Sequence, residues 1–424
     1  MAEVQCEVEL AWGKAALRCH IPAGNLVGVY SPPPLAACAD AMEEARRALA
    51  NPLDTPPLSR LVQPGEKVLI LVDDHTRATP VAEILPAMLG QLGSAGVAEG
   101  DITILVTHGT HRLSTPEEVQ AKVGEEVCRR FRVLQHRADD EASQVFLGVT
   151  SRGTPVWVNR LVMEADRCLG IGHIGPSPYA GYSGGGKLIL PGAAALDTID
   201  ANHSLVAVGF RRHGWVEGPC RQDIDEAAAL ARLDLVLDVV LNQEERVVRA
   251  FAGTPARVFR EGLPLARRAF EVPCPGQVDV AITSGFPYDI DLYQAVRAVE
   301  YADVAVRPGG SILLVAACPQ GVGGDEFREL LMDRNRKPDA YLRDVVRRRG
   351  KVTFGVLGYF LARIRAEKEL YIVGSDIPRA DLEAMGFGCP ASLQAGVDAL
   401  LQKYGPRARV AVFPQGSGTI PVVS

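Results

Sequence analysis

The chain has 424 residues, of which 47% are hydrophobic and 23% are charged, and its formal net charge is −6 at pH 7. These values are typical of a globular protein with two or three domains and a large core. An acidic balance without a block of five like charges argues against nucleic-acid and anionic-membrane partners. We therefore expect a small-molecule ligand.

Nine cysteines are present, an odd number, and none forms a Cys-x-x-Cys pair. Such usage favours free thiols in a reducing compartment. The N-terminus is acidic where a signal peptide would be basic, and no run of about 18 apolar residues follows. The sequence predicts a cytoplasmic protein without a membrane partner and leaves the oligomeric state open.

The first elements alternate between scaffold and polar loops. Residues 4–21 alternate around Gly13 and predict a β-hairpin, and a helix is expected over 39–50. Residues 67–72 then read as a buried strand that runs into an Asp-Asp-His-Thr-Arg loop, with an amphipathic helix after Pro80.

The same pattern follows at once. Strand-like residues 101–106 lead into Thr-His-Gly-Thr-His-Arg, and Thr115 begins a helix with a capping box. Residues 145–158 predict a hairpin, and 167–172 a third short strand. Because ligands of open α/β sheets bind beyond the carboxyl ends of the strands, we expect the three polar loops to converge.

A glycine loop, residues 181–187, follows the third strand and reads Gly-Tyr-Ser-Gly-Gly-Gly-Lys. The glycines Gly184, Gly185 and Gly186 could let backbone N–H groups cradle an anion beside Lys187. Only 8 of the 45 basic residues are lysines, so this amine is a candidate nucleophile.

The glycine loop also matches the G-x-x-x-x-G-K part of a P-loop. A P-loop continues with Ser or Thr and a helix, whereas Leu188 follows here, and residues 188–192 predict a short β-like run. A P-loop-like nucleotide-binding protein is therefore the second hypothesis, and a purely structural turn is another.

After a proline-rich segment near residues 273–276, strands and helices are again predicted to alternate along the chain. We predict an α/β fold of two domains with largely parallel sheets. The first domain spans 1–272, the second spans 277–405, and the tail 408–424 packs back on the first. A helix over 193–206 carries His203, and the second domain begins with a strand, a polar loop and a helix from 292.

Five of the eight histidines lie in or after the polar loops of the first domain, and histidine is the usual general base and a common metal ligand. Asp74 and Arg77 could form a local ion pair. Alternatively, the forked donors of Arg77 could bind a carboxylate or phosphate of a ligand. Gln294 and Arg297 share one helix face and offer several donors. The five histidines are His75, His108, His111, His173 and His203.

The ordered set of motifs resembles the nickel-dependent lactate racemase family over nearly the whole chain. The resemblance implies an active site in the cleft between two α/β domains. It implies a nickel-pincer nucleotide (pyridinium-3-thioamide-5-thiocarboxylic acid mononucleotide nickel) covalently attached to Lys187, with His203 completing the nickel coordination. The motifs are Asp74-x-x-Arg77, Thr107-His-Gly-Thr-His-Arg112, Tyr179-Ala-Gly-Tyr-Ser-Gly-Gly-Gly-Lys187, His203 and Tyr293-Gln-Ala-Val-Arg297.

The resemblance also implies roles for other residues. His111 matches a catalytic base, and Asp74, Ser183 and the three glycines would help to hold the nucleotide. The substrate, a 2-hydroxy acid or sugar acid, would be oriented by Arg77, Tyr293, Gln294 and Arg297. The family transfers a hydride transiently from C2 to the cofactor, and enzymes of cofactor synthesis are implied partners.

One position departs from the family pattern. The second family histidine lies ten residues before the lysine, and that position is Ser177 here. Three interpretations stay open: an assisted Ser177, a replacement base (His173, His108 or Tyr179), or one-faced hydride transfer. The smaller side chain suits a substrate larger than lactate, and a catalytically altered cofactor-binding relative is a further alternative.

Overall fold

The computed structural model describes residues 4–423. Contacts within the chain divide it into two compact units. We call residues 34–269 the central unit, and residues 4–33 with 270–423 the terminal unit. Each unit contains a largely parallel sheet with helices, so the predicted α/β class is confirmed.

The division differs from the predicted one at the N-terminus. Residues 1–272 were expected to form one domain, but strand β3 (Leu26–Val29) pairs in parallel with β18 (Val410–Phe413). The first described residues therefore belong to the terminal unit. A pairing across nearly 400 residues leaves no local pattern in the sequence, so periodicity could not reveal it.

The C-terminal tail also belongs to the terminal unit, which corrects the expectation that 408–424 packs on the first domain. Strand β18 pairs with β15 (Val278–Ser284), and β19 (Ile420–Val423) pairs with β14 (Glu271–Cys274). Both pairings are parallel and bury backbone groups of the tail within this unit.

Six strands form the sheet of the central unit, in the order β13-β12-β9-β4-β5-β6. All neighbours are parallel except β12 and β13. Strand β4 is apolar and buried until its last residue, as expected for a strand covered on both faces. The strands are β4 (Val68–Asp73), β5 (Ile102–Thr107), β6 (Arg132–Gln135), β9 (Arg167–His173), β12 (Leu233–Leu241) and β13 (Val247–Gly253).

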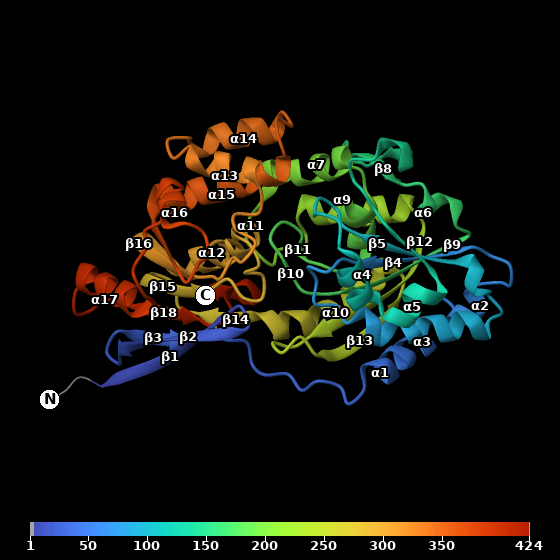
Figure 1. The fold of residues 1–424 in the computed structure, drawn as a ribbon, viewed down its shortest axis with the longest axis horizontal. Helices are drawn as coiled ribbons and strands as arrows, with labels where there is room; N and C mark the ends of the chain where they lie inside the picture. Colours follow the sequence, from blue (N-terminus) through green and yellow to red (C-terminus); the bar gives the residue numbers. More distant parts are fainter. Residues whose placement is uncertain (1–3, 424) are drawn as a thin grey trace. The chain divides into compact units, whose positions relative to one another are not determined.

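Helices α1 and α3 lie on one side of this sheet and α9 on the other (Figure 1). Leu49 of α1 and Met88 of α3 belong to one apolar cluster, and Leu188 and Ile224, the latter on α9, belong to a second. The helices of this unit are α1 (Ala41–Ala50), α2 (Leu58–Leu61), α3 (Val81–Ser94), α4 (Pro116–Val123), α5 (Glu125–Arg130), α6 (Leu161–Glu164), α7 (Leu196–Ser204), α8 (Val206–Gly209), α9 (Pro219–Leu230) and α10 (Pro255–Phe270).

Local predictions for the central unit hold with one exception. Thr115 caps α4 in a capping box, and β7 (Gln144–Val149) pairs with β8 (Pro155–Asn159) as a hairpin. A second, short pair joins β10 (Pro176–Ser177) to β11 (Gly181–Tyr182). The β-like run predicted after Lys187 is wrong, because the chain instead makes two short helical turns, Gly185–Leu188 and Ile189–Ala193.

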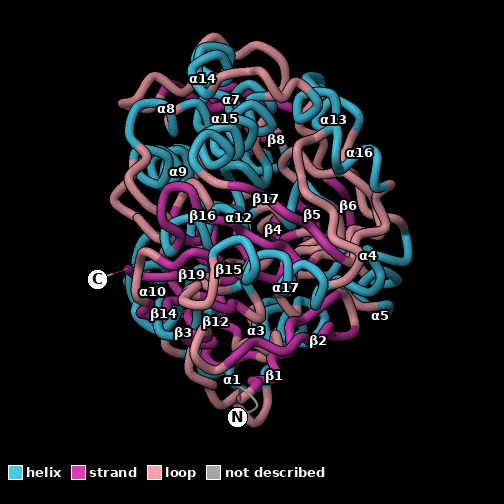
Figure 2. The backbone as a smooth tube through the Cα atoms, turned by 90° about the vertical axis from the view of Figure 1, so that its left-hand side faces the viewer, coloured by secondary structure: helices cyan, strands magenta, loops and turns pink. Residues whose placement is uncertain are grey.

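The terminal unit contains a five-stranded, fully parallel sheet in the order β17-β16-β15-β18-β3. Figure 2 distinguishes strands, in magenta, from the helices around them. The remaining strands are β1 (Gln5–Trp12), β2 (Ala15–Pro22), β16 (Val306–Val315) and β17 (Glu369–Val373). The helices are α11 (Leu292–Ala295), α12 (Arg297–Ala302), α13 (Asp325–Met332), α14 (Pro338–Val346), α15 (Val352–Glu367), α16 (Arg379–Ala384) and α17 (Leu393–Tyr404).

Strands β1 and β2 pair as the antiparallel hairpin predicted around Gly13. Within residues 4–423, no helix is long and apolar enough to span a membrane.

Candidate active site

The carboxyl end of β4 lies between those of β9 and β5, which are its two neighbours in the sheet. The predicted polar loops follow these three strands. Asp73 ends β4 and Asp74 follows it, His108 and His111 follow β5, and His173 ends β9. The expected convergence is confirmed by direct contacts of each aspartate with a histidine from a neighbouring strand.

Asp74 is buried and binds His111. The Nδ1 atom of His111 lies 2.7 Å from Asp74 Oδ2, while the backbone N–H and hydroxyl of Thr76 donate to Oδ1. Burial alone would raise the pKa of Asp74, but the charge of His111 and hydrogen bonds from His108 and His111 hold the pKa well below its ordinary value. The carboxylate is therefore ionised and accepts the Nδ1–H of His111.

Arg77 contacts the other side of the same imidazole. Its Nη2 lies 3.3 Å from His111 Nε2, and its Nη1 donates to the hydroxyl of Thr76 at 3.1 Å. Because a guanidinium can only donate, Nε2 must carry a lone pair. When the ring is neutral, Asp74 and Arg77 thus favour the tautomer of His111 with Nδ1 protonated and a lone pair on Nε2.

His108 and His75 lie beside the same carboxylate. His108 is buried, and its Nδ1 lies 3.5 Å from Asp74 Oδ2. The Nδ1 of His75 lies 2.8 Å from Ser114 Oγ, and burial lowers its pKa. Asp74, His75 and His108 offer ligand atoms within 4.8 Å of one another, but His111 and Thr76 already occupy the carboxylate.

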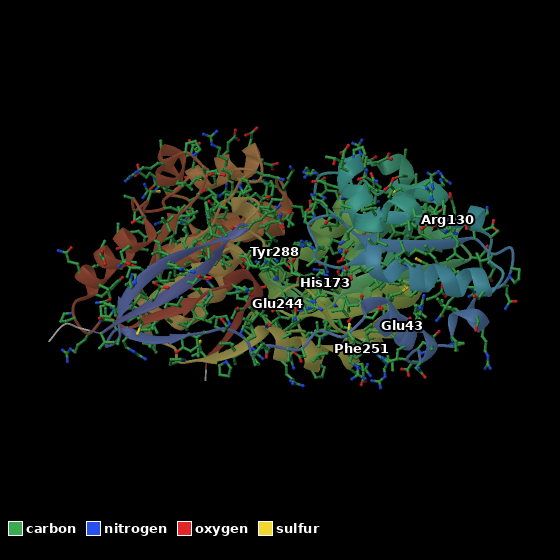
Figure 3. All side chains as sticks on the ribbon, turned by 60° about the horizontal axis from the view of Figure 1, so that its bottom comes forward. Glu43, Arg130, His173, Glu244, Phe251 and Tyr288 are labelled. Carbon is green, nitrogen blue, oxygen red and sulfur yellow. The ribbon has the colours of Figure 1, made fainter. Side chains whose placement is uncertain are left out.

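A second network joins Asp73 to His173, whose position in the central unit is labelled in Figure 3. The Thr79 hydroxyl donates to Asp73 Oδ2 and lies 2.7 Å from His173 Nδ1, which is 3.4 Å from the same carboxylate oxygen. Lys122 Nζ is 2.6 Å from Asp73 Oδ1. Burial would raise the pKa of Asp73, but the Lys122 charge and the His173 hydrogen bond lower it below its ordinary value.

Ser177 and Lys187 are brought together by the small β10 and β11 pair. The Nζ of Lys187 donates to Ser177 Oγ at 3.0 Å, and Ser177 is only 6% exposed. The hydroxyl of Ser177 therefore already accepts a hydrogen bond from the lysine that the sequence singled out.

The glycine loop packs against protein on the faces where side chains are missing. A Cβ would lie 2.7 Å from Ile174 at Gly184, 2.8 Å from Arg221 at Gly185 and 2.7 Å from Ala228 at Gly186. Protein packing thus explains the three glycines. Their contact with a nucleotide stays a prediction.

Two buried charged residues hold the glycine loop. Asp238 Oδ2 accepts the N–H of Gly185 at 2.6 Å, and Arg221 Nη1 donates to the carbonyl of Gly184 at 3.0 Å. Arg221 also stacks on Phe259, 3.5 Å from the ring centroid. Burial raises the pKa of Asp238 to about 7. The N–H of Gly185 is thus already used, which weakens the P-loop interpretation.

Ser183 also supports the backbone locally. Its hydroxyl accepts the N–H of Gly175 at 3.0 Å and lies 2.9 Å from the carbonyl oxygen of His173. The predicted role of Ser183 in holding a nucleotide is not tested by these contacts.

His203, on α7, presents a ligand-competent nitrogen. Its Nδ1 donates to the carbonyl of Ile199 at 2.8 Å, so the neutral ring carries its lone pair on Nε2. Burial lowers the pKa of His203 to about 4, and Lys187 contributes to this shift. The ring of Tyr179 packs edge-on against His203, with centroids 5.6 Å apart. A neutral imidazole of this kind suits a metal such as nickel.

The other predicted substrate residues lie in the terminal unit. Gln294 is buried on α11, where Asp291 caps the helix by accepting the Gln294 N–H at 2.8 Å. Arg297 begins α12 and lies over the ring of Tyr288, 4.3 Å from its centroid. Tyr293 packs edge-on against Phe327.

Sequence reasoning missed several supporting residues. Asp238 was detectable as a carboxylate inside an otherwise apolar strand, and Thr79 as a hydroxyl in the polar loop after β4. Lys122 and Arg221 lie on ordinary-looking helices, and no local pattern distinguishes them from surface residues.

Comparisons with known proteins identify the family of this chain. The family model of the lactate racemase N-terminal domain matches residues 12–213, and that of the C-terminal domain matches residues 273–421. The lactate racemase of Lactiplantibacillus plantarum is 30% identical over 386 residues, which cover 89% of this chain and 90% of that protein. The lactate racemase of Thermoanaerobacterium thermosaccharolyticum is 30% identical over 326 residues, or 76% of each chain.

Solved structures extend the comparison to the fold. The lactate racemase apoprotein of T. thermosaccharolyticum superposes with a TM-score of 0.88 and 27% identity, covering 98% of this chain and all of that one. A Thermotoga maritima protein superposes with a TM-score of 0.71 at 18% identity, covering 91% of this chain and 98% of its own, and shows only the shared fold. The chain is a member of the lactate racemase family.

Proposed function

We propose that this protein is a nickel-pincer-nucleotide-dependent racemase or epimerase of 2-hydroxy acids. The observation that carries the proposal is the Asp74 and His111 pair. An ionised carboxylate fixes the imidazole so that its basic Nε2 faces Arg77. Such a group can take a hydroxyl proton from a substrate whose carboxylate is bound by a guanidinium.

The donor set fits the proposed cofactor. Lys187 carries an amine that lies at the glycine loop, beside Ser177, and His203 presents a neutral Nε2. Lys187 would form the covalent attachment, and His203 would bind nickel. When bound, the cofactor supplies an acceptor for the C2 hydrogen as hydride. Asp74, Ser183 and the glycine loop remain proposed neighbours of its nucleotide.

Residues of the chain itself would transfer the hydroxyl proton and bind the substrate. His111 holds the hydroxyl proton at Nε2 and returns it, while Asp74 keeps the ring in one tautomer. Arg77 orients the substrate carboxylate, and we assign Tyr293, Gln294 and Arg297 to substrate binding as well.

We propose a substrate larger than lactate, such as a longer 2-hydroxy acid or a sugar acid. A serine at position 177 fills less space than the imidazole that the family resemblance implies there. Its hydroxyl accepts from Lys187, which also argues against an unassisted Ser177 as the second base.

The surroundings of the protein follow from the same proposal. A cofactor made elsewhere requires the enzymes of its synthesis as partners. All nine cysteines are free thiols, which supports a cytoplasmic location.

Intact-mass measurement tests the cofactor. Protein produced together with cofactor-synthesis enzymes should carry an adduct on Lys187 and bound nickel. The Lys187→Ala variant is the matched control and should carry no adduct. Absence of both adduct and nickel from the unmodified chain would refute the proposal.

A substrate panel tests the reaction. Cofactor-loaded protein should interconvert the stereoisomers of at least one enantiopure 2-hydroxy acid, monitored by chiral chromatography. Loaded protein that turns over none of them would instead be a catalytically altered relative. The P-loop-like alternative requires ATP with magnesium to produce a thermal shift or turnover.

A further inference from the structure

The proposed reaction needs proton transfer on both faces of the substrate carbon, and His111 supplies one face. The other family position is occupied by Ser177, and a hydroxyl is a far weaker base than an imidazole at neutral pH. A replacement base elsewhere in the central unit is therefore the stronger candidate for the second group.

Asp73, the last residue of β4, and Asp74, which follows it directly, contact residues from different neighbouring strands. Asp74 binds His111, which follows β5, whereas Asp73 binds the network of His173 at the end of β9. Because β9 and β5 flank β4, the two histidines lie on either side of one strand end.

The Asp73 network fixes the tautomer of His173. The ionised carboxylate can only accept, so the Thr79 hydroxyl donates its hydrogen to Asp73. The Thr79 oxygen must then accept the Nδ1–H of His173 at 2.7 Å, which leaves a lone pair on Nε2. This is the tautomer that Asp74 imposes on His111.

The Nε2 edge of His173 faces a position without a side chain. A Cβ on Gly175 would lie 3.1 Å from Nε2 and 3.0 Å from Cδ2, so a glycine at this position keeps a side chain off the Nε2 edge. The side chain of His173 keeps 7% of its surface exposed at the carboxyl end of the sheet. Its surroundings are thus tight but not closed.

The competing groups lack this arrangement. His108 is buried, and its Nδ1 lies 3.5 Å from Asp74 Oδ2, the oxygen that His111 contacts at the shorter distance of 2.7 Å. Tyr179 packs its ring edge against His203. Of the three replacement bases that the sequence left open, His173 is the one whose Nδ1 is linked to a carboxylate through a hydroxyl at 2.7 Å and whose Nε2 edge meets a glycine at position 175.

We propose that His173 is the second proton-transferring residue of the site and that Asp73 positions it through the Thr79 hydroxyl. The assignment rests on the proposed function. When bound, the nucleotide would accept the C2 hydrogen with its electron pair, and His173 Nε2 would take the hydroxyl proton of one stereoisomer, which leaves the 2-keto acid. For the other stereoisomer, His111 takes the hydroxyl proton.

Single-turnover quench experiments on cofactor-loaded protein separate the two faces. His173→Asn should slow keto-acid formation from one stereoisomer by about 10²–10⁴-fold and change the other by less than about tenfold. His111→Asn should show the reverse preference. His20→Gln alters an exposed histidine of the terminal unit and is the matched control. Equal losses from both stereoisomers in His173→Asn would overturn the assignment.

Nitrogen-15 NMR of the imidazoles tests the positioning without turnover. His173 should show a protonated Nδ1 and an unprotonated Nε2 at neutral pH, and Thr79→Val should abolish that preference. An unprotonated Nδ1 in the unmodified protein would overturn the inference. If the tautomer is as expected but the unmodified, loaded protein forms no keto acid from any 2-hydroxy acid, the proposed function itself fails, and the role of His173 fails with it.

Discussion

The central and terminal units end their parallel sheets in chemically different ways. At the carboxyl end of β4, the side chains of Asp73 and Asp74 hold histidines in defined tautomers. At the carboxyl end of β15, Ser284 donates to the carbonyl of Ala11 and accepts the N–H of Phe286. The polar side chains at the carboxyl end of β4 bind other side chains, whereas those at the carboxyl end of β15 bind backbone groups. We call the first the chemical edge and the second the terminal edge.

Asp289 of the terminal unit illustrates the contrast with Asp74. Its Oδ2 accepts the N–H groups of Gly13 at 2.9 Å and Ala317 at 3.2 Å. A carboxylate that is satisfied by backbone donors stabilises its loop but does not orient a base. A carboxylate in the loop that follows a parallel strand can thus be structural or chemical, depending on its donors.

The largest expected effect comes from Asp74→Asn, which tests the chemical edge directly. The amide can donate to His111 Nδ1 and so favour the wrong tautomer, with Nε2 protonated. We expect kcat to fall by about 10²–10⁴-fold in loaded protein. Steady-state racemisation of the best substrate measures this loss.

The control for Asp74→Asn is Asp398→Asn, an exposed position of the terminal unit. Far-ultraviolet circular dichroism should show the same fold for both variants. A tenfold or smaller loss of kcat in Asp74→Asn would mean that turnover does not depend on the Asp74 carboxylate at the chemical edge.

Arg221→Met should have the next largest effect, on stability. The substitution removes the donor to Gly184 and the stacking on Phe259, and leaves a buried carbonyl unsatisfied. We expect the free energy of unfolding to fall by about 2–4 kcal/mol, measured by urea denaturation. A loss of stability in Arg221→Met, beside a loss of kcat in Asp74→Asn, would show that the central unit has separate residues for supporting the glycine loop and for proton transfer.

Arg257→Met is the matched control, because Arg257 is one-third exposed and pairs with the accessible Glu261. Its loss should be about 1 kcal/mol or less. Equal losses in the two variants would show that the buried Arg221 contacts give no special support to the glycine loop.

The sequence revealed the order of local elements and the residues nearest the chemistry. Buried strands followed by polar loops located Asp74, His111 and His173, because the carboxyl ends of neighbouring parallel strands must meet. Their partners were harder to predict. Thr79 and Lys122 reach the site only through the packing of separate elements, and side-chain hydrogen bonds leave no periodic signal.

The boundary between the units and the contacts of the glycine loop could not be predicted from the sequence for a related reason. Strand β3 joins the terminal sheet through a partner nearly 400 residues away. Gly185 looked like a phosphate contact, but its N–H is taken by Asp238, which lies about 50 residues later in a strand. In both cases the deciding contact is remote in the chain.

Asp238→Asn should change the pH dependence of stability. Burial raises the pKa of Asp238 to about 7, from 3.8 for an exposed aspartate. The folded state therefore binds an extra proton between pH 4 and 7, and the free energy of unfolding falls as the pH rises through this range. The stabilising contribution is fully present below about pH 4 and lost above about pH 7.

Urea denaturation at pH 5 and pH 7 measures this effect. The contribution of Asp238 should fall by about 1–3 kcal/mol between these values, and Asp238→Asn should remove that part of the slope. Asp398→Asn should keep the slope of the unmodified protein. An unchanged slope in Asp238→Asn would show that this carboxyl is ionised in the folded state throughout the range.

Arg297→Lys should have the smallest effect and tests the terminal edge. The guanidinium lies over Tyr288 and offers a fork of donors, which suits a carboxylate, whereas an ammonium offers a single point charge. We expect KM to rise about tenfold, or about 1.4 kcal/mol, with kcat changed less than about threefold.

Arg307→Lys, in the same unit and paired with Asp279, is the control and should leave both constants unchanged. A binding residue loses affinity, but a proton-transferring residue loses turnover. If Arg297→Lys lowered kcat as strongly as Asp74→Asn while KM stayed constant, the terminal unit would take part in the chemical step. The contrast between the chemical edge at β4 and the terminal edge at β15 would then be wrong.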